Sequence, residues 1–332
     1  MVFASFENDY KGQSELMVSV DSNPMFSFIG VSTRLSSIMR VFPHWMADLG
    51  RTMPLVGIDL PLHAPAQQYR EVLAGIKDDP NQVGGLVTTH KLDLYAAGWD
   101  LFDEVDAYAH LCGEVSCISK HGARLVGHAK DPITAGLSLT EFVPVNHWQQ
   151  TGGAALCLGA GGAALAISLH LLTNAAVGNA PSRLTLTDVS AARLAHAQQI
   201  HTQLARSRVL PVAVDYVQVS PHDSSRVDGL LRDLPEGSLL INATGMGKDR
   251  PGSPIGADAV LPRRGLIWEL NYRGELDFLK QAEAQRNERE LQLQDGWRYF
   301  LHGWTQVIEE VLHIQLSEAQ FAGWAQIAAQ VR

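Results

Sequence analysis

Three small residues near the middle of the chain are spaced to hold a phosphate group. Gly159, Gly161 and Ala164 fill the pattern G-x-G-x-x-A. In that pattern the first glycine allows a tight turn, the second lets the backbone approach a pyrophosphate, and the last small residue packs a helix against a strand. A helix that begins here presents free N–H groups and a partial positive charge to the phosphates. The spacing therefore predicts a dinucleotide site.

The segments around this turn supply the context that the motif requires. A short apolar run, 154–158, precedes the glycines, and a second expected strand, 184–187, ends in Asp188. Strand, glycine turn, helix and strand in this order make a nucleotide-binding unit. Asp188 follows the glycines by more than the about 20 residues of the usual unit. A long loop expected over 174–182 accounts for the extra length. The alternative is a glycine turn that only packs a helix on a sheet.

Asp188 also indicates which dinucleotide would bind. A carboxylate at this strand end accepts hydrogen bonds from the adenosine ribose and repels a 2′-phosphate. Because Val189 follows and no arginine stands beside the acid, the sequence favours NAD, with NADP the less favoured cofactor. The alternative for Asp188 is a helix N-cap before Ala191, a position where Asp is common.

Composition limits the class of protein. A chain of 332 residues is too long for one ordinary core, so two domains are expected. Its 46% hydrophobic and 18% charged residues are typical of a globular soluble protein. A net charge of −9 without a basic run argues against nucleic acid as a partner.

Cysteine and histidine usage, and the absence of long apolar runs, narrow the class further. The three cysteines, Cys112, Cys117 and Cys157, lack metal-ligand spacing and indicate a reducing compartment. The 13 histidines are scattered, so no metal is expected. The N-terminus lacks the apolar core of a secretory signal. No apolar run reaches the ~20 residues that span a bilayer, so we expect a cytoplasmic protein without a membrane partner.

Alternating strands and helices predict an α/β fold with two domains. Strands are expected over 26–30, 54–60, 83–88, 113–120, 123–127, 154–158, 184–187, 212–219, 238–243 and 265–270. The expected order is an extension over 1–24, an α/β substrate domain over 25–132, a Rossmann-type doubly wound parallel-sheet domain over 133–292 and C-terminal helices over 293–332 that pack back on the hinge and the substrate domain. Ligands collect at the carboxyl ends of strands in such sheets, and the run 242–245 lies at such an end.

Several short segments are similar to the motifs of one enzyme family. Leu35-Ser36 with Met39 is similar to S-L-S-P-x-M. Further matches are VTTHK (87–91) to T-x-x-P-x-K, GEVSC (113–117) to G-A-V-N-T, RLVGHAKD (124–131) to R-L-x-G-x-N-T-D, LGAGGA (158–163), INAT (241–244), Tyr272 and the Asp-Gly pair 295–296. From about residue 26 to about residue 314 the chain resembles the shikimate/quinate dehydrogenase family.

The resemblance implies a catalytic pair, Lys91 and Asp131. Hydride transfer between a secondary alcohol and NAD leaves a proton to be moved at the oxygen, and a positioned lysine can donate or accept that proton. A neighbouring carboxylate would bind the same hydroxyl and hold the ammonium in place. The alternatives are a solvated turn lysine and a helix-capping aspartate. The resemblance also implies these cofactor-binding residues: Gly159, Ala160, Gly161, Gly162, Ala163, Asp188, Asn242, Ala243, Thr244 and Gly245.

The substrate pocket departs from the family pattern. Family residues that bind the substrate carboxylate and hydroxyls fall on Arg34, Gly85, Val87, Ser116, Ala129 and a position near His302 or Gly303. Lost hydrogen-bond partners weaken binding of a polar substrate, so shikimate itself is not the expected substrate. The alternative is that other residues of the pocket still bind quinate or shikimate. Arginine binds carboxylates in a bidentate way, so Arg34 is expected to hold an acidic group, unless it is a surface residue of a shortened loop. The substrate-binding candidates are Arg34, Ser36, Val87, Ser116, Tyr272 and His302.

The sequence thus predicts an oxidoreductase similar to shikimate/quinate dehydrogenases. It would transfer a hydride between NAD and a secondary alcohol or ketone of a small carboxylic acid. The altered pocket leaves a second hypothesis open, a non-catalytic protein that senses NAD or a metabolite on the same fold. The family resemblance also implies a possible homodimer.

Overall fold

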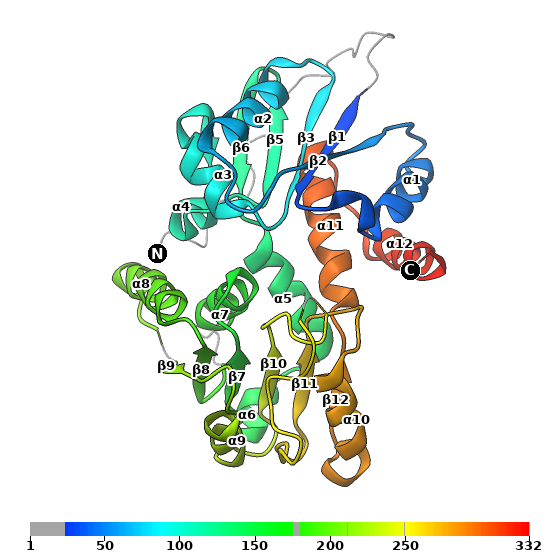
Figure 1. Cartoon of the computed structure of the whole chain (residues 1–332). Coiled ribbons are helices and arrows are strands. Elements are labelled where there is room, and N and C mark those ends of the chain that lie inside the picture. Colours follow the sequence, from blue (N-terminus) through cyan, green and yellow to red (C-terminus); the bar gives the residue numbers. More distant parts are fainter. Residues whose placement is uncertain (1–23, 175–179, 211, 249, 332) are drawn as a thin grey trace.

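Two six-stranded sheets, one above the other in Figure 1, form the frame of the molecule. The computed structural model describes residues 24–174, 180–210, 212–248 and 250–331. The extension expected over 1–24 therefore lies almost wholly outside the described residues. Most of the loop expected over 174–182 lies outside them too.

The first sheet is mixed, with the order β2-β1-β3-β5-β6-β4. Its strands are β1 (Met25–Gly30), β2 (Leu55–Asp59), β3 (Gln82–Val87), β4 (Glu104–Val105), β5 (Cys117–His121) and β6 (Arg124–His128). Strand β5 runs antiparallel to both β3 and β6, so β3 and β6 point the same way. The carboxyl ends of β3 and β6 therefore meet at one edge of the sheet.

Short helices connect these strands. They are η1 (Thr33–Leu35), α1 (Ile38–Asp48), α2 (Ala66–Asp78), α3 (Lys91–Gly98), η2 (Trp99–Leu101) and α4 (Ala107–Cys112). Helix α1 begins at Ile38, shortly after the single turn η1. The N-cap of α1 is Ser37, and its side chain makes no capping hydrogen bond.

The second sheet is wholly parallel, with the order β12-β11-β10-β7-β8-β9. Its strands are β7 (Ala155–Leu158), β8 (Arg183–Asp188), β9 (Ala213–Gln218), β10 (Leu239–Asn242), β11 (Leu266–Glu269) and β12 (Gln292–Gln294). Its helices include α6 (His147–Thr151), α7 (Gly162–Asn174), α8 (Ala191–Ser207), α9 (Ser225–Arg232) and α10 (Asp277–Arg289). Strands β7 and β10 are buried along their whole length, as expected for a sheet covered on both faces. The predicted two-domain α/β class is confirmed.

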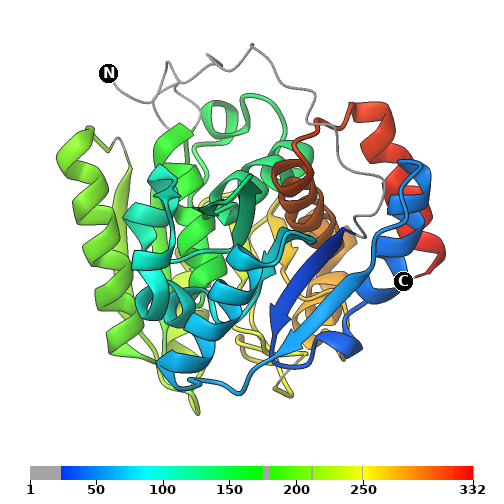
Figure 2. The same ribbon diagram turned by 90° about the horizontal axis from the view of Figure 1, so that it is seen from above.

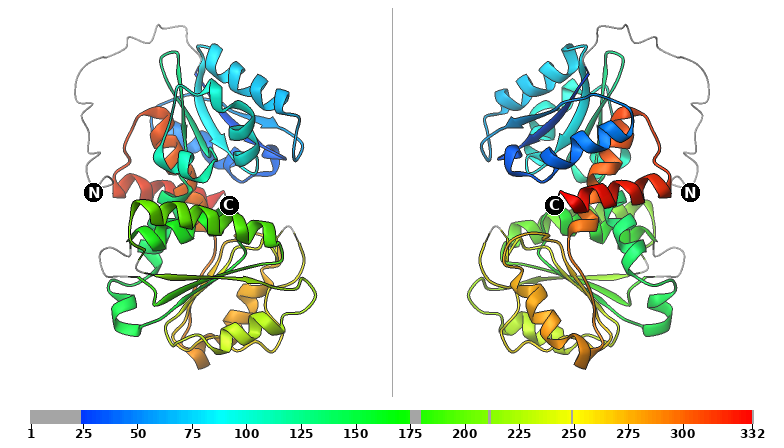
Figure 3. Two further views of the ribbon diagram at one scale, coloured as in Figure 1. Left: turned by 90° about the vertical axis from the view of Figure 1, so that its left-hand side faces the viewer. Right: turned by 90° about the vertical axis from the view of Figure 1, so that its right-hand side faces the viewer.

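Two long helices join the sheets. Figure 3 shows the molecule as two lobes. Helices α5 (Asp131–Phe142) and α11 (Trp297–Leu312) run from one lobe toward the other (Figure 1). The two helices pack against each other, and the Arg298 guanidinium binds the Glu141 carboxylate across them, with Nε 2.6 Å from Oε2. The last turn of α5 and the first turn of α11 are therefore tied to each other.

The last helix, α12 (Glu318–Gln330), packs on α1 of the first lobe (Figure 2). The Trp45 and Trp324 rings stack with centroids 4.8 Å apart and an interplanar angle of 11°. Trp45 Nε1 donates to the Trp324 carbonyl at 3.0 Å, and Trp324 Nε1 donates to Asp48 at 2.8 Å. Both indole N–H groups are thus satisfied while the rings are buried.

Candidate active site

Lys91 and Asp131 meet at the sheet edge where β3 and β6 end. After β3 the chain turns through Thr89, whose φ is +62°, and α3 begins at Lys91. After β6 the chain enters α5 at Asp131, whose N-cap is Lys130. Lys91 Nζ donates a hydrogen bond to Asp131 Oδ2. Two residues that lie 40 positions apart in the sequence are therefore in direct contact.

The electrostatic surroundings keep Lys91 protonated in the free protein. Burial lowers the pKa of the Lys91 ammonium, but the Asp131 and Glu114 carboxylates outweigh it and hold that pKa above its ordinary value. The side chain is only 21% exposed, so these charges are weakly screened. The group at this position is therefore a proton donor in the free protein.

Glu114 is a member of this cluster that the sequence analysis did not identify. The residue is 4% exposed, and burial raises the pKa of its carboxyl to about 7, although Lys91 opposes the shift. The adjacent backbone N–H of Val115 donates to the Lys91 carbonyl at 3.3 Å, which holds the two segments together. The signal in the sequence was an acid within a short, otherwise uncharged run that leads into a buried strand.

A cavity of about 590 Å³ opens beside the Lys91–Asp131 pair. Four predicted substrate-binding residues line it, namely Ser36, Val87, Ser116 and Tyr272. Much of the remaining lining is apolar or aromatic: Phe28, Leu86, Leu270, Tyr299, Phe300, Trp304 and Val307. The structure therefore brings these four candidates together around the Lys91–Asp131 pair, in a largely apolar setting.

Arg34 and His302 do not line this cavity. Arg34 lies exposed in η1, and its charge helps to lower the pKa of Asp59. His302 is buried in α11, stacked on Phe321 at 4.3 Å, with Nε2 3.0 Å from Glu141 Oε1. The cationic side chains that do reach the cavity, besides Lys91, are Lys248 and Arg273.

Arg273 spans the two lobes at the mouth of this cavity. It follows β11 of the second sheet, and its Nη1 donates to the Leu35 carbonyl of the first lobe at 3.3 Å. Because Arg273 is exposed and Lys248 half-buried, both keep contact with solvent. An acidic group entering the cavity would meet these two charges.

At Gly85, where the family has a substrate-binding side chain, the backbone leaves no room for one. Gly85 lies in β3 between two strands, and a Cβ placed on it would lie 2.1 Å from the carbonyl oxygen of Ser27 in β1. No side chain fits there without moving β1. The departure from the family pattern at this position is therefore built into the sheet.

The glycine turn after β7 has the geometry expected for a dinucleotide site. Gly159 has φ +108°, and a Cβ on it would lie 2.7 Å from the Ala243 carbonyl oxygen, so glycine is required there. A Cβ on Gly161 would meet nothing within 4 Å, so the backbone is open to an incoming group. Helix α7 then begins at Gly162. These residues fit a bound pyrophosphate.

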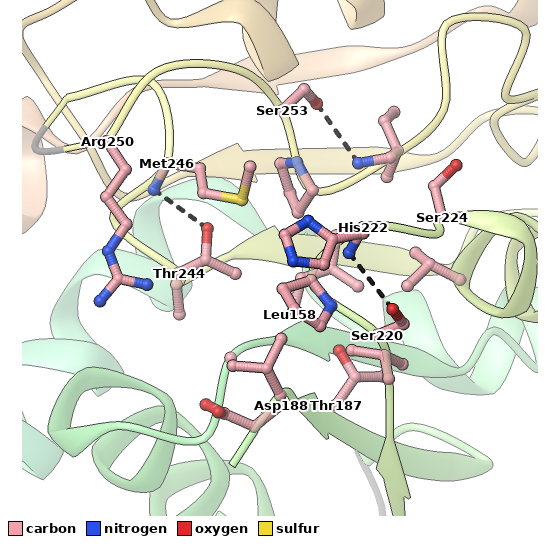
Figure 4. A pocket seen from close by; sticks show the side chains of 18 of the residues that line it. Leu158, Thr187, Asp188, Ser220, His222, Ser224, Thr244, Met246, Arg250 and Ser253 are labelled. Atoms are coloured by element: carbon pink, nitrogen blue, oxygen red, sulfur yellow. Dashed lines mark hydrogen bonds between the residues drawn. The ribbon is translucent and has the colours of Figure 1, made fainter.

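A second cavity, of about 520 Å³, lies along this turn (Figure 4). Among the predicted cofactor residues, Gly159, Gly161, Asp188, Ala243 and Thr244 line it. His222, Arg193 and Arg250 also line it, and Arg193 Nη1 lies 3.9 Å from Asp188 Oδ2. No arginine is adjacent to Asp188 in the sequence, but Arg193 approaches its carboxylate from the first turn of α8.

Asp188 is not the N-cap of α8. That cap is Ser190, whose hydroxyl accepts a hydrogen bond from the Arg193 N–H. The Asp188 carboxylate instead accepts hydrogen bonds from the backbone N–H groups of Ala160 and Ser190, each at 2.8 Å. The structure therefore contradicts the capping alternative, and it ties the acid to the glycine turn.

Asn242 has a structural place in the site. It is fully buried, its amide donates to Glu269 at 2.7 Å, and its side-chain oxygen accepts from the Thr244 hydroxyl at 2.6 Å. The next glycine, Gly245, has φ +75°. Asn242 thus shapes the loop from which Ala243 and Thr244 face the second cavity.

The glycine turn also connects the two cavities. Gly161 lines the cavity with Asp188, whereas Ala163, two residues on, lines the cavity with Lys91 and Asp131. Within the described ranges, no group of three or more His, Cys, Asp or Glu side chains could hold a metal ion. No helix among those residues is long and apolar enough to cross a membrane.

Comparisons with known proteins agree with this geometry. Shikimate dehydrogenase (NADP(+)) of Lactococcus lactis subsp. cremoris strain MG1363 is 30% identical over 189 residues, which are 57% of this chain and 60% of that relative. The corresponding protein of Symbiobacterium thermophilum is 29% identical over 212 residues, 63% of this chain and 64% of the relative. The matches thus span less than two thirds of each relative. No family model matches the chain.

Solved structures extend the similarity to nearly the whole chain. Quinate dehydrogenase from Corynebacterium glutamicum in complex with NAD superposes with a TM-score of 0.72 at 20% identity, covering 93% of this chain and 100% of that one. This chain is thus similar to shikimate dehydrogenases over part of its sequence, and to the fold of shikimate and quinate dehydrogenases over nearly all of it. A 5-ketofructose reductase of Gluconobacter sp. shares the family fold with a TM-score of 0.68 at 19% identity. Structural similarity at about 20% sequence identity shows the fold alone. The substrate must therefore be inferred from the pocket.

Proposed function

We propose that this protein is an NAD(P)-dependent oxidoreductase that interconverts a secondary alcohol and a ketone on a small carboxylic acid. One observation carries the proposal: the Lys91–Asp131 pair lines a cavity that the first turn of α7 also lines, through Ala163. A reacting carbon held at this pair would thus lie beside the dinucleotide-binding helix. Hydride transfer requires that proximity.

A proton must move at the substrate oxygen in this reaction. The bound dinucleotide would supply or accept the hydride. The Lys91 ammonium, kept protonated by Asp131 and Glu114, would hydrogen-bond the ketone oxygen and donate its proton as the alcohol forms. In the reverse direction Lys91 must first lose a proton and then accept that of the hydroxyl. Asp131 holds the Lys91 side chain in position through both directions.

The pocket favours an acid with fewer polar groups than shikimate. Val87 and Gly85 stand where the family has side chains that bind substrate hydroxyls, and the cavity floor is aromatic and aliphatic. We propose that Lys248 and Arg273 attract the carboxylate of the substrate, since they line this cavity. The role expected for Arg34 stays a prediction and would require its exposed side chain to turn into the cleft.

We propose NAD as the preferred cofactor. The Asp188 carboxylate lines the adenosine-side cavity, where it would accept ribose hydrogen bonds and repel a 2′-phosphate. Arg193 and Arg250 line the same cavity, and they are the groups through which NADP would bind if it were accepted.

A screen of the purified protein tests the proposal. Absorbance at the reduced-nicotinamide band is followed with NAD or NADP and a panel of cyclic, aromatic and linear hydroxy acids and their keto forms, quinate and shikimate included. Turnover of at least one acid, with higher kcat/KM for NAD, is expected. Binding of NAD in calorimetry with no turnover on any member of the panel would contradict the enzyme and favour the sensor hypothesis.

A further inference from the structure

A third cavity, of about 580 Å³, lies between helices of the two lobes. Its wall in the first lobe is α4, through Tyr108 and Leu111, and its wall in the second lobe is the end of α8, through Leu204 and Arg208. In Figure 1, α4 lies above α7 and α8, and it packs against α8. Small-molecule sites commonly have volumes of about 300–1,000 Å³ and lie preferentially between domains. The size and place of this cavity are therefore those of a ligand site.

This cavity is separate from the site of the proposed reaction. None of the described residues that line it lines the cavity beside Lys91 or the cavity along the glycine turn. Thr173, which lines it, lies ten residues after Ala163 on α7, and ten helical residues span about 15 Å. A ligand in this cavity would thus leave both of the other cavities open.

The body of the cavity is apolar and accessible. Ala107 is exposed, and Tyr108 and Leu111 are half-buried, so these three side chains keep surface that a ligand can cover. Leu204, which is 3% exposed, completes the apolar wall from the side of α8. A flat aromatic ring would cover this surface, and it would stack on the Tyr108 ring or meet it edge-on.

The charges around the cavity favour an anion. Arg208 and His110 line it, and none of its described lining residues is an aspartate or glutamate, although acids outnumber lysine and arginine in the chain by 35 to 26. Asp106, which caps α4, accepts hydrogen bonds from the Ala109 and Ala129 N–H groups, so its carboxylate is bound to backbone. The full charge of Arg208 outweighs the partial negative charge at the end of α8. Its guanidinium can bind a carboxylate through two N–H groups.

The polar groups of the cavity meet at the Tyr108 hydroxyl. Burial raises the pKa of this hydroxyl, and a hydrogen bond with Thr173 and the charge of Arg208 oppose the rise. These three residues belong to α4, to α7 and to the end of α8, so groups from both lobes converge on one point. A carboxylate held by Arg208 would therefore lie at the junction of the lobes.

We propose that the cavity between α4 and α8 binds a small aromatic carboxylate, with its ring on Tyr108, Leu111 and Leu204 and its carboxylate on Arg208. The ligand would contact both lobes and add contacts between them outside the reaction cleft. It would therefore oppose changes in the angle between the lobes. This inference goes beyond the proposed oxidoreductase function and does not depend on it.

Calorimetric titration of the full chain with naphthalene-2-carboxylate tests the site, and naphthalene-2-carboxamide is the uncharged match. The carboxylate is expected to bind on the order of 10-fold more tightly than the amide, because only the carboxylate forms an ion pair with Arg208. Arg208→Gln in the second lobe and Tyr108→Ala in the first should each weaken binding of the carboxylate on the order of 10-fold.

Two further variants separate this effect from misfolding. Ala107→Trp places a large side chain in the cavity from the exposed first turn of α4, and it should weaken binding while Arg208 stays in place. Arg206→Gln changes an exposed arginine of the same helix that does not line the cavity, and it should change Kd by no more than about 2-fold. Without ligand, the unfolding temperatures of Arg208→Gln and Arg206→Gln should equal that of the parent.

Four results would overturn the proposal. The first is no binding of the carboxylate at millimolar concentration, or binding no tighter than that of the amide. The second is parental affinity in both Arg208→Gln and Ala107→Trp. The third is weaker binding in Arg208→Gln with parental affinity in Tyr108→Ala, which would confine the ligand to the second lobe. The fourth is loss of binding only in Arg273→Gln, which would place the acid in the cavity beside Lys91.

Discussion

Asp188 Oδ2 accepts a hydrogen bond from the backbone N–H of Ala160 at 2.8 Å, so the acid that ends β8 fastens the glycine turn that follows β7. Its other oxygen accepts from the Ser190 N–H at 2.8 Å. Asp188 is only 7% exposed, and it nevertheless lines the second cavity, beside the glycine turn. One side chain can thus shape the turn and still receive hydrogen bonds from a ribose.

Replacing this acid should therefore change stability and cofactor preference together. In Asp188→Ala two backbone N–H groups lose their acceptor, which should lower the free energy of unfolding by about 1–3 kcal/mol. The ratio of kcat/KM for NAD to that for NADP should fall, because repulsion of a 2′-phosphate is lost and Arg193 and Arg250 remain. Asp215→Ala, which removes an exposed ion pair with Arg183 on the same sheet, should change neither quantity appreciably. An unaltered cofactor ratio in Asp188→Ala would rule out the role proposed for the acid.

Removal of the Lys91 amine should abolish proton transfer and leave the fold intact. Lys91→Ala is expected to lower kcat by about 10²–10⁴, the usual contribution of a positioned acid or base. Lys77→Ala serves as the control, since Lys77 pairs with Asp103 outside the cavity. Circular dichroism should give the same spectrum for both variants and the parent. Turnover by Lys91→Ala within a few-fold of the parent would show that another group moves the proton.

Glu114 should make stability depend on pH. Its pKa in the folded protein is raised from 4.5 to about 7, chiefly by burial. The folded protein therefore keeps a proton that the unfolded chain releases, and this stabilisation is complete at low pH and is lost as pH rises through about 7. Glu114→Gln cannot titrate, so its free energy of unfolding relative to the parent should increase by about 1–3 kcal/mol between pH 5 and pH 8. Urea unfolding at several pH values measures the difference.

Glu269 could produce a similar pH dependence, because burial raises the pKa of its carboxyl to about 7 as well. Glu269 titrates in the parent and in Glu114→Gln alike, so its contribution cancels from the comparison. A difference between the two proteins that stays constant from pH 5 to pH 8 would contradict the raised pKa of Glu114.

Two glycines that stand at or near family substrate-binding positions should respond oppositely to the same change. Gly85→Ala places a Cβ 2.1 Å from the Ser27 carbonyl oxygen, and overpacking of this kind should lower the free energy of unfolding by about 1–3 kcal/mol or more. The Cβ added by Gly303→Ala in α11 lies no closer than 3.8 Å to any neighbouring atom. Replacing glycine within a helix should therefore raise the free energy of unfolding by about 0.5–1 kcal/mol. Thermal unfolding compares the two variants, and equal effects would refute the packing argument.

The sequence alone determined the features that depend on local spacing. The glycine pattern, the flanking apolar runs and the terminal acid predicted β7, the turn, α7 and β8, because a tight turn and a buried parallel strand each have a short local signature. The pairing of Lys91 with Asp131 came from the family resemblance, and no local pattern would have connected them.

Tertiary structure alone decided which side chains share the cavity. Arg34 lies outside the cavity, whereas Arg273 from the other lobe lines it. The reason is that the short turn η1 and the loop after β11 meet only when the two sheets dock. The place of Glu114 depends on the contact of its segment with Lys91. The hydroxyls of Thr134 and Tyr299, which are buried without a hydrogen-bond partner among the described residues, depend on how α5 packs against α11. Burial, charge and hydrogen-bond satisfaction at these positions arise from contacts between distant segments, and residue spacing along the chain does not encode such contacts.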